Sequence, residues 1–514
     1  MGRPVLATLF LAAAIANRSQ AQNPAVASVV NAFSNQGGQP VSPGELATIF
    51  GSNLAVGSAQ CSNPLPLPTT CGGASVLIGG KPAPVAIATA TQLTIQIPYE
   101  VSGTSTTLQV SRQSGSQTLP SNSVTIQVAP TAPGMSTSDN SGSGLGLFLN
   151  SSSAQITAAS PAQQGDSVSA FGNGFGATNP AVATAAAAPS NPLARFVAPV
   201  AATVGGQPAV VLADVLVPNQ VSIAQVNFQV PTCLAGGNQP FVVNVGGVNS
   251  PPVMLPVAPS KAAVSATLVI SAGAYGAYPS VSPGSWVEIY GAGLSTTTRQ
   301  WSGADFTGTN APTSLDGVRV TIGGQQAFIW YISPTQVNAQ VPSNVAVGPA
   351  QLTLTNAAGT TGACSVTVNA LQPGLLAPSS FQVSGKQYTA AQFLDYQTFA
   401  VPVGAVAGVS SRPAKPGESI VLWGVGFGPA TNGSNQSIPS GQVAPQSSQL
   451  VNPVQFQIGG DAATSTYAGL APGSVGAYEF IVTVPSVPDS DAVPLTFTQS
   501  GVKGTQTLYI AVHQ

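Results

Sequence analysis

The sequence predicts an all-β protein built as a tandem array of small β-sandwich domains. Its 514 residues include 56 glycines and 45 prolines, and no long apolar stripe of helical periodicity is visible. This pattern indicates short strands separated by many turns. A short phrase, in which a turn leads into an apolar strand and an aromatic–glycine pair, recurs four times, as expected for an array of similar domains. The four copies are Val41–Leu54, Gln164–Phe175, Val281–Leu294 and Lys415–Phe427.

Each phrase is followed by a Gly-Gly pair and then by a strand that ends at a proline. From the second glycine to that proline, the first and third copies span 98 − 80 = 18 and 342 − 324 = 18 residues. The second and fourth copies span 231 − 206 = 25 and 485 − 460 = 25 residues. A two-domain unit duplicated in tandem explains this alternation. We therefore expect four domains, called repeats one to four, at residues 22–130, 131–258, 259–371 and 372–514.

The strand in each phrase has one predicted core face, because successive side chains of a strand point to opposite sides. In repeat three, Val287 and Ile289 face the core, and Trp286 and Tyr290 project from the other face. The glycine after each aromatic residue suits a bend or bulge, and the Gly-Gly pairs suit hairpin turns with positive φ. The aligned core pairs are Ala47/Ile49, Val168/Ala170 and Ile420/Leu422.

The strand before each proline carries polar side chains on one face and, in repeats one to three, apolar side chains on the other. In repeat three this polar ladder is Gln336, Asn338 and Gln340. The ladder is either a solvated face of a charge-poor protein, or an amide surface that docks another domain or a polar ligand such as a glycan. The corresponding residues are Gln92/Thr94/Gln96, Gln225/Asn227/Gln229 and Glu479/Ile481/Thr483.

Composition and the first residues indicate an exported protein. Charged residues make up 5% of the chain and the net charge is −2, so the basic surface typical of nucleic-acid binding is missing. Arg3, the apolar run 5–16 and the small residues Ser19 and Ala21 predict a secretory signal peptide over residues 1–21. The mature sequence has no segment long and apolar enough for a transmembrane helix. We expect the protein outside the cell, on its surface or in the periplasm.

Four cysteines fit an oxidising compartment. Cys61 and Cys71 lie ten residues apart in one loop of repeat one, which predicts a local disulfide. Cys233 and Cys364 lie in repeats two and three, and they either pair across a domain junction or remain free. Spacing does not decide between these alternatives.

The order of these motifs resembles the IPT/TIG class of immunoglobulin-like (Ig-like) domains. It resembles more closely the Ig-like repeat of secreted acidobacterial proteins of the Solibacter type. Repeat four matches best, with Arg412–Glu418, Trp423–Gly428, Gln457–Gly460 and Tyr467–Tyr478. The resemblance implies an Ig-like fold, a secreted or surface-exposed protein, and no catalytic residues. Together with the repeat spacing, it predicts four Ig-like β-sandwiches in two duplicated units.

The residue inventory disfavours catalysis. His513 is the only histidine, so a Ser-His-Asp or Cys-His arrangement would have to use it. We expect no enzyme activity, no cofactor and no metal site. Glu45, Asp166 and Glu418 follow equivalent turns, where a turn-capping role is favoured over a calcium site.

We therefore predict a non-enzymatic protein that acts in adhesion, scaffolding or extracellular binding. Its partner would be a polysaccharide or another surface protein. One alternative is a carbohydrate-binding module that uses aromatic residues of repeat three, although these residues can equally pack against repeat two or four. An extracellular hydrolase or its accessory is a third, disfavoured alternative. The candidate ligand-binding residues are Trp286, Tyr290, Trp330, Tyr331, Gln336, Asn338 and Gln340.

Overall fold

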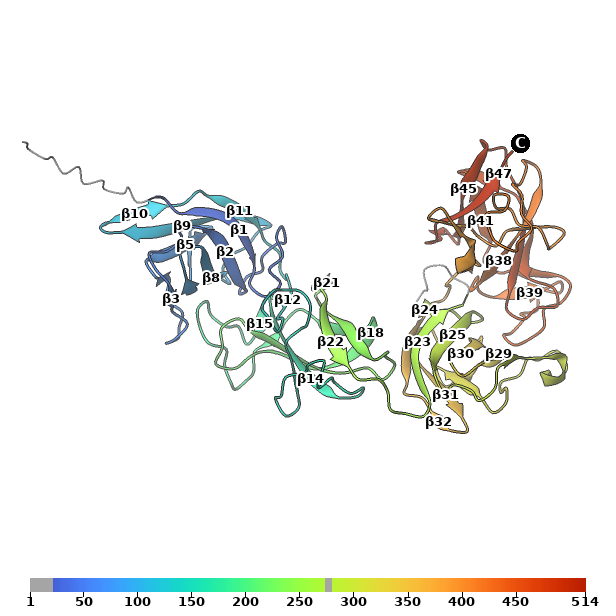
Figure 1. Cartoon of the computed structure of the whole chain (residues 1–514), viewed down its shortest axis with the longest axis horizontal. Helices are drawn as coiled ribbons and strands as arrows, with labels where there is room; N and C mark the ends of the chain where they lie inside the picture. Colours follow the sequence, from blue (N-terminus) through green and yellow to red (C-terminus); the bar gives the residue numbers. More distant parts are fainter. Residues whose placement is uncertain (1–21, 273–279) are drawn as a thin grey trace, which may run out of the picture.

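The computed structural model describes residues 22–272 and 280–514, so the predicted signal peptide lies outside the described residues. Within these ranges the chain forms strands joined by turns, with two 3-10 turns, η1 (Gly303–Asp305) and η2 (Ser379–Phe381), and no α-helix. The all-β prediction is therefore confirmed. No helix in the described ranges has the length and apolar character needed to cross a bilayer. In Figure 1 the four repeats follow one another from blue to red, and repeat four lies above repeat three.

Repeats one and three have the same first sheet. Its strand order is β1-β2-β8-β7-β3 in repeat one and β23-β25-β30-β29-β26 in repeat three. The corresponding strands occur in the same order along the chain, which agrees with a duplication. In repeat one the strands are β1 (Ala25–Asn31), β2 (Leu46–Ser52), β8 (Gln92–Gln96), β7 (Val85–Ala88) and β3 (Ala59–Gln60). In repeat three they are β23 (Ser265–Ser271), β25 (Trp286–Ala292), β30 (Gln336–Gln340), β29 (Phe328–Ile332) and β26 (Arg299–Gln300).

A second sheet covers the core face of the first in both repeats. It is built around the pair β5–β9 in repeat one and β27–β31 in repeat three. In repeat one it contains β4 (Thr70–Cys71), β5 (Ala74–Ile78), β6 (Lys81–Ala83), β9 (Ser105–Ser114), β10 (Gln117–Pro120) and β11 (Val124–Gln127). In repeat three it contains β24 (Ser280–Val281), β27 (Arg319–Ile322), β28 (Gln325–Gln326), β31 (Gly348–Asn356), β32 (Gly359–Thr360) and β33 (Cys364–Val368).

Repeats two and four have the same central ladder, in which the strand of the phrase pairs with the strand before the proline. The order is β12-β14-β19-β18 in repeat two and β34-β38-β44-β43 in repeat four. Repeat two contains β12 (Gly134–Met135), β14 (Ser167–Asn173), β19 (Ala224–Gln229), β18 (Gln207–Leu216), β17 (Val200–Val204), β20 (Gly237–Val245) and β22 (Val253–Val257). Repeat four contains β34 (Gly374–Leu375), β38 (Ser419–Val425), β44 (Tyr478–Thr483), β43 (Ser465–Leu470), β41 (Val454–Ile458), β45 (Ser490–Gln499) and β47 (Leu508–Val512).

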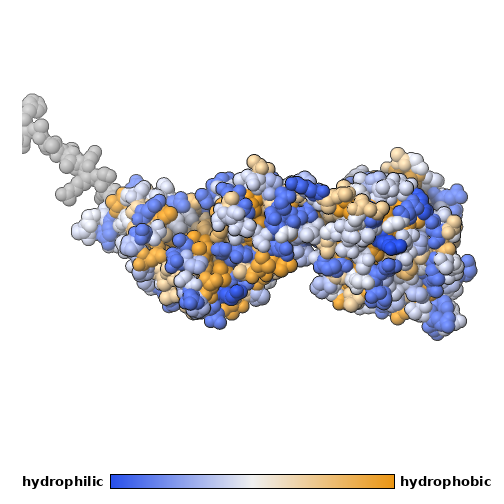
Figure 2. Space-filling model, turned by 90° about the horizontal axis from the view of Figure 1, so that it is seen from below, coloured by the Kyte–Doolittle hydropathy of each residue, from blue (hydrophilic) through white to orange (hydrophobic). Residues whose placement is uncertain are grey.

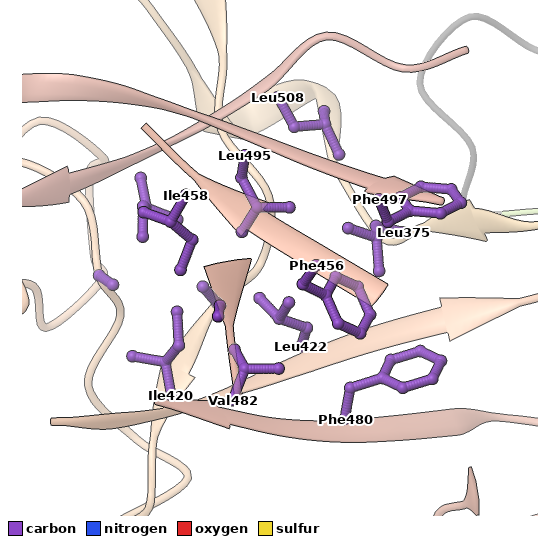
Figure 3. Close-up of a cluster of buried hydrophobic side chains, with 14 of the residues drawn as sticks. Leu375, Ile420, Leu422, Phe456, Ile458, Phe480, Val482, Leu495, Phe497 and Leu508 are labelled. Carbon is purple, nitrogen blue, oxygen red and sulfur yellow. The ribbon is translucent and has the colours of Figure 1, made fainter. Parts of the chain in front are cut away.

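Buried apolar side chains gather between the sheets of each repeat. The predicted core pairs, Val287/Ile289 among them, are all buried. Figure 3 shows this packing in repeat four, where Leu422 and Phe480 from one sheet meet Phe456 and Phe497 from the other. Large buried clusters span residues 26–128, 135–257, 264–368 and 375–512, and the third also includes Cys233. The domain boundaries at 130, 258 and 371 stay a prediction.

The repeated glycines have two different structural roles. Both residues of the four repeated Gly-Gly pairs, which end at Gly80, Gly206, Gly324 and Gly460, have positive φ, between 56° and 97°, as the hairpin prediction requires. Gly51 and Gly291, which follow Phe50 and Tyr290, serve close packing instead. A Cβ atom at either position would lie only 2.1 or 2.0 Å from a carbonyl oxygen of the neighbouring strand. The neighbouring strand is bulged near this point in both repeats, so the missing side chain lets the two backbones approach.

Candidate functional site

The candidate site lies on the non-core face of the first sheet of repeat three. Antiparallel pairing of β25 with β30 sets Trp286 opposite Gln340, Glu288 opposite Asn338, and Tyr290 opposite Gln336. Strand β29 adds Trp330 and Tyr331 next to β30. The sheet therefore brings all seven predicted residues onto three adjacent strands.

This face borders a cleft of about 480 Å³ between repeats three and four, called here the repeat-three cleft. Of the predicted residues, Trp286, Trp330 and Asn338 line it, whereas Tyr290, Tyr331, Gln336 and Gln340 do not. Sequence reasoning did not assign three further lining residues to the site, Glu288, Trp301 and Phe306. Repeat four contributes Leu376, Val425, Val443, Gly473, Ser474, Val475 and Ala477.

Trp286 is the buried floor of the repeat-three cleft. Its side chain is only 7% exposed, and its indole Nε1 donates a hydrogen bond to the Val475 carbonyl of repeat four at 3.1 Å. The rings of Trp301 and Trp330 meet it edge-on, with centroids 5.7 and 6.0 Å away. Trp286 does project from the non-core face as predicted, but for this residue packing against repeat four is the correct alternative.

Trp330 is the more accessible tryptophan of the cleft, at 36% exposure. It lies at a bulge in β29, because Ile329 pairs with Ala339 while Tyr331 pairs with Asn338. The extra residue interrupts the alternation of the strand. Trp330 is therefore accessible to a ligand, whereas Trp286 is buried.

Most of the polar ladder is paired within the sheet. The Gln336 side-chain amide donates to Asn338 Oδ1 at 2.8 Å, and the Tyr290 hydroxyl donates to Glu288 Oε2 at 2.6 Å. Burial, together with the bond to Glu288, raises the pKa of Tyr290 to about 12. The phenol thus stays protonated at neutral pH and acts as a hydrogen-bond donor.

Gln340, the last residue of the ladder, connects repeats three and four. Its side-chain oxygen accepts the Gly441 N–H of repeat four at 2.7 Å, and its side-chain nitrogen donates to the Gly284 carbonyl at 3.0 Å. Gln96 does the same in repeat one: it accepts the Ala185 N–H of repeat two at 2.6 Å and donates to Ser222 at 2.8 Å. The docking interpretation of the ladder therefore holds for its last residue in both units.

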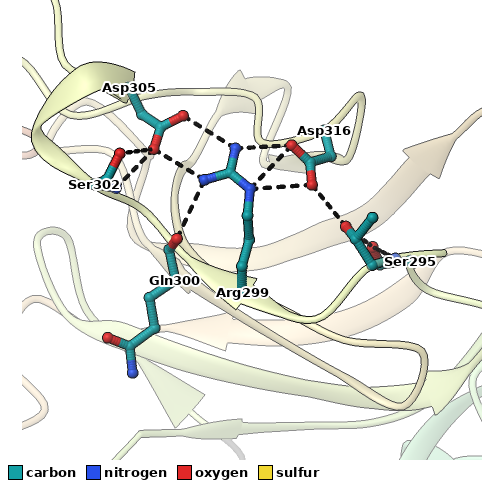
Figure 4. Close-up of polar contacts among 7 residues, drawn as sticks. Ser295, Arg299, Gln300, Ser302, Asp305 and Asp316 are labelled. Atoms are coloured by element: carbon teal, nitrogen blue, oxygen red, sulfur yellow. Dashed lines mark hydrogen bonds and ion pairs between the residues drawn. The ribbon is translucent and has the colours of Figure 1, made fainter.

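An Arg–Asp cluster holds the loop that brings Trp301 and Phe306 to the cleft. Arg299 pairs with Asp305 at 3.0 Å and with Asp316 at 2.7 Å, at the two sides of this loop (Figure 4). The hydrogen bonds from Arg299 lower the pKa of both carboxyls, so they stay ionised at neutral pH. The same loop pairs with repeat four, since the Ala311 N–H donates to the Gly441 carbonyl at 2.7 Å.

In repeat one the corresponding loop is closed by the predicted disulfide. Cys61 follows β3 as Trp301 follows β26, and the Cys61–Cys71 bond spans the loop. Within it, the Leu67 N–H donates to the Ala185 carbonyl of repeat two at 3.0 Å. The loop is thus closed by a disulfide in repeat one and by ion pairs in repeat three. In each unit the loop contacts the following repeat, which is repeat two or repeat four.

Of the two alternatives for Cys233 and Cys364, the structure shows pairing across the domain junction. Cys233 of repeat two and Cys364 of repeat three form a disulfide. Beside it, the Thr232 hydroxyl donates to the Ala363 carbonyl at 2.8 Å. The two units of the duplication are therefore joined by this bond as well as by the main chain.

The acidic residues after the turns act as caps at two positions. Asp166 accepts the N–H of Gln163 at 2.8 Å, and Glu418 accepts the N–H of Lys415 at 2.9 Å. No group of three or more His, Cys, Asp or Glu side chains in the described ranges is arranged to hold a metal ion. His513 lies 3.0 Å from Asp491, and both side chains are exposed.

Comparison with known proteins identifies the class. The model of the IPT/TIG domain matches residues 28–128 and 278–383, which correspond to repeats one and three. These two repeats therefore match the IPT/TIG domain, whose fold is Ig-like. No match to a curated protein was found.

Several solved structures are similar at low identity. The full extracellular region of plexin A4 is 11% identical with a TM-score of 0.18, and the match covers 98% of this chain but 31% of that one. The Bacteroides ovatus protein SGBP-B, solved with a mixed-linkage heptasaccharide, is 14% identical with a TM-score of 0.15, and the match covers 90% of this chain and 93% of that one. The titin fragment I67–I69 is 10% identical with a TM-score of 0.12, and the match covers 69% of this chain and 95% of that one.

Proposed function

We propose that the mature chain is an exported, non-enzymatic scaffold and adhesion protein that presents binding clefts between docked Ig-like repeats. The Cys233–Cys364 disulfide is the observation that carries this proposal. It fixes the junction between the two units, and such bonds persist in oxidising compartments outside the cytoplasm. A fixed junction keeps the two units of the chain at a set separation, as a scaffold requires.

The repeat-three cleft supports a binding role. Exposed aromatic residues in a concave, largely apolar site are typical of ligand and protein interfaces. Trp330 lines it and is partly exposed, Trp286 is buried in it, and Arg299 holds the loop that carries Trp301 and Phe306. The partner class proposed for this cleft is another surface protein, with a polysaccharide as the second candidate.

Retention of purified residues 22–514 on isolated cell envelopes and on insoluble polysaccharides tests the proposal. Retention on envelopes that weakens with Trp330→Ala supports adhesion to a surface protein. Retention on one polysaccharide, also weakened by Trp330→Ala, supports the carbohydrate-binding alternative. Val403→Ala is the control, because this residue is exposed, lies in a turn outside the strands and does not line the cleft. Failure of the wild-type protein to bind either material would reject adhesion and leave only a spacer role.

A further inference from the structure

The first unit has its own cleft, at the position that corresponds to the repeat-three cleft. This repeat-one cleft has a volume of about 580 Å³ and lies on the non-core face of β2, β8 and β7, against repeat two. Thr48, Phe50, Gln92 and Thr94 form its sheet side. The loop closed by the Cys61–Cys71 disulfide contributes Leu65 and Leu67. Repeat two contributes Asn140, Gln220, Val221 and Ile223.

The repeat-one cleft offers apolar surface to a ligand. Phe50 is 38% exposed and Leu65 is 36% exposed, although both are large apolar side chains. An exposed aromatic ring in a concave site provides a flat face for the C–H groups of a ligand. In Figure 2 apolar patches are visible between hydrophilic ones on the lobe next to the grey N-terminal trace, which contains repeats one and two.

Three polar side chains that line this cleft are free, whereas the Asn35 amide donates to the Asn140 carbonyl at 2.9 Å. In the described part of the chain, the side-chain amides of Gln92 and Gln220 and the hydroxyl of Thr94 have no hydrogen-bond partner within the protein. Thr48 has none either, but it is only 3% exposed. In the repeat-three cleft, by contrast, Asn338 Oδ1 accepts from Gln336 at 2.8 Å and Glu288 Oε2 accepts from Tyr290 at 2.6 Å. The repeat-one cleft thus presents unused donors and acceptors beside apolar surface.

The charge of the lining limits the class of ligand. None of the described residues that line the repeat-one cleft is charged. A charged ligand would lose hydration there without gaining an ionic partner. A neutral ligand with many hydroxyls would instead pair with the two amides and Thr94, while its C–H faces cover Phe50 and Leu65.

The cleft is also held in shape before any ligand arrives. The Cys61–Cys71 disulfide closes the loop that carries Leu65. Gln96 and Leu67 both bond to Ala185 and so fix repeat two against the sheet. A preformed site loses less conformational entropy on binding.

From these observations we propose that the repeat-one cleft binds a segment of a neutral polysaccharide. Phe50 and Leu65 supply the apolar contact, and Gln92, Gln220 and Thr94 supply the hydrogen bonds. The assignment does not depend on the repeat-three cleft, so either site can be rejected without the other.

Affinity gel electrophoresis of residues 22–514 tests this assignment. The probes are the neutral soluble polymers dextran, xyloglucan and galactomannan, with anionic polygalacturonate for comparison. We expect at least one neutral polymer to retard the protein and polygalacturonate not to do so. Phe50→Ala and Gln92→Ala should each weaken the interaction about tenfold or more. Both sites are surface positions, and an unchanged thermal transition verifies folding.

Trp330→Ala is the matched control, since it alters the other cleft and should leave the retardation unchanged. Retardation that is lost with Trp330→Ala but kept with Phe50→Ala would overturn the assignment and move glycan binding to repeat three. Equal binding by wild type and both repeat-one variants would also overturn it, as would no retardation by any of the neutral polymers. Retention on cell envelopes in that last case would leave the proposed adhesive function intact.

Discussion

Gln96 and Gln340 make the same contact in the two halves of the chain. They lie 340 − 96 = 244 residues apart, and each accepts a backbone N–H from the following repeat, from Ala185 and from Gly441. Both side chains are buried. A buried amide that satisfies a backbone donor of another repeat stabilises docking, because removing it leaves that donor without a partner.

The Gln340 contact makes a prediction for stability. Gln340→Ala should lower the free energy of unfolding of repeats three and four by about 1–3 kcal/mol. All four tryptophans lie in these two repeats, so tryptophan fluorescence during urea denaturation reports on this unit. The matched control is Gln351→Ala: Gln351 of repeat three is exposed and its side chain donates only to Ser365, and its loss should cost about 0.5 kcal/mol or less. Equal effects of the two variants would contradict the docking role.

The two tryptophans of the repeat-three cleft should respond differently to truncation. Trp286→Ala removes a buried ring and should destabilise the protein by about 3–5 kcal/mol. Trp330→Ala removes a partly exposed ring and should cost about 1.5 kcal/mol or less. Differential scanning calorimetry distinguishes the two, and a similar loss of stability in both variants would refute the difference in burial. Trp330 is therefore the residue for binding studies, because loss of binding in a Trp286 variant would reflect instability.

Glu45 should make stability depend on pH. Burial raises the pKa of its carboxyl well above the ordinary value, although Ser42 and Asn31 donate hydrogen bonds to it; its Oε1 has no partner in the described structure. The folded chain therefore keeps this proton at a pH where the unfolded chain, with a carboxyl pKa of about 4.3, has lost it. The contribution of Glu45 to stability is fully present below the unfolded pKa and falls as pH rises towards the folded pKa.

Glu45→Gln should remove this dependence and raise the free energy of unfolding at pH 7. Urea denaturation between pH 4 and pH 8 measures the effect. The matched variant is Glu418→Gln, because Glu418 is paired with Arg412 and its pKa is lowered. An unchanged slope in Glu45→Gln above pH 4.5 would show that the carboxyl is not responsible.

The ion pairs of Arg299 should limit the mobility of the loop over residues 301–316. Arg299→Ala breaks the contacts to Asp305 and Asp316, and hydrogen exchange of residues 301–316 should become faster. The control is Arg319→Ala, since Arg319 is exposed and makes no ion pair in the described structure. High salt should reduce the difference between wild type and Arg299→Ala, because screening weakens exposed ion pairs. Unchanged exchange in Arg299→Ala would show that backbone pairing with repeat four suffices.

Short-range periodicity predicted the strands and their core faces. The alternation from Trp286 to Tyr290 assigned Val287 and Ile289 to the core, and the Gly-Gly pairs predicted hairpins with positive φ; both predictions are confirmed. These features depend on neighbouring residues alone, so one sequence is sufficient to recognise them. The resemblance to IPT/TIG domains is confirmed for repeats one and three, whereas the closer resemblance to the Solibacter-type repeat stays a prediction.

The lining of the clefts could not be predicted in the same way. Trp286 is buried because repeat four covers it. No local sequence pattern predicts which face of a sheet the next repeat will cover. Trp301 and Phe306 reach the cleft through a loop without periodicity, held by Arg299 and two aspartates. Glu288 could have been predicted from the sequence, since it lies between Trp286 and Tyr290 on the same face of β25.

The Cys233–Cys364 bond also determines what proteolysis can do to this protein. The two cysteines are 131 positions apart in the sequence, and the loop held by Arg299 lies between them. A single cut anywhere between the two cysteines would leave the N-terminal and C-terminal fragments covalently attached. Only reduction would release them, so a nicked molecule outside the cell would still hold whatever its two ends had bound.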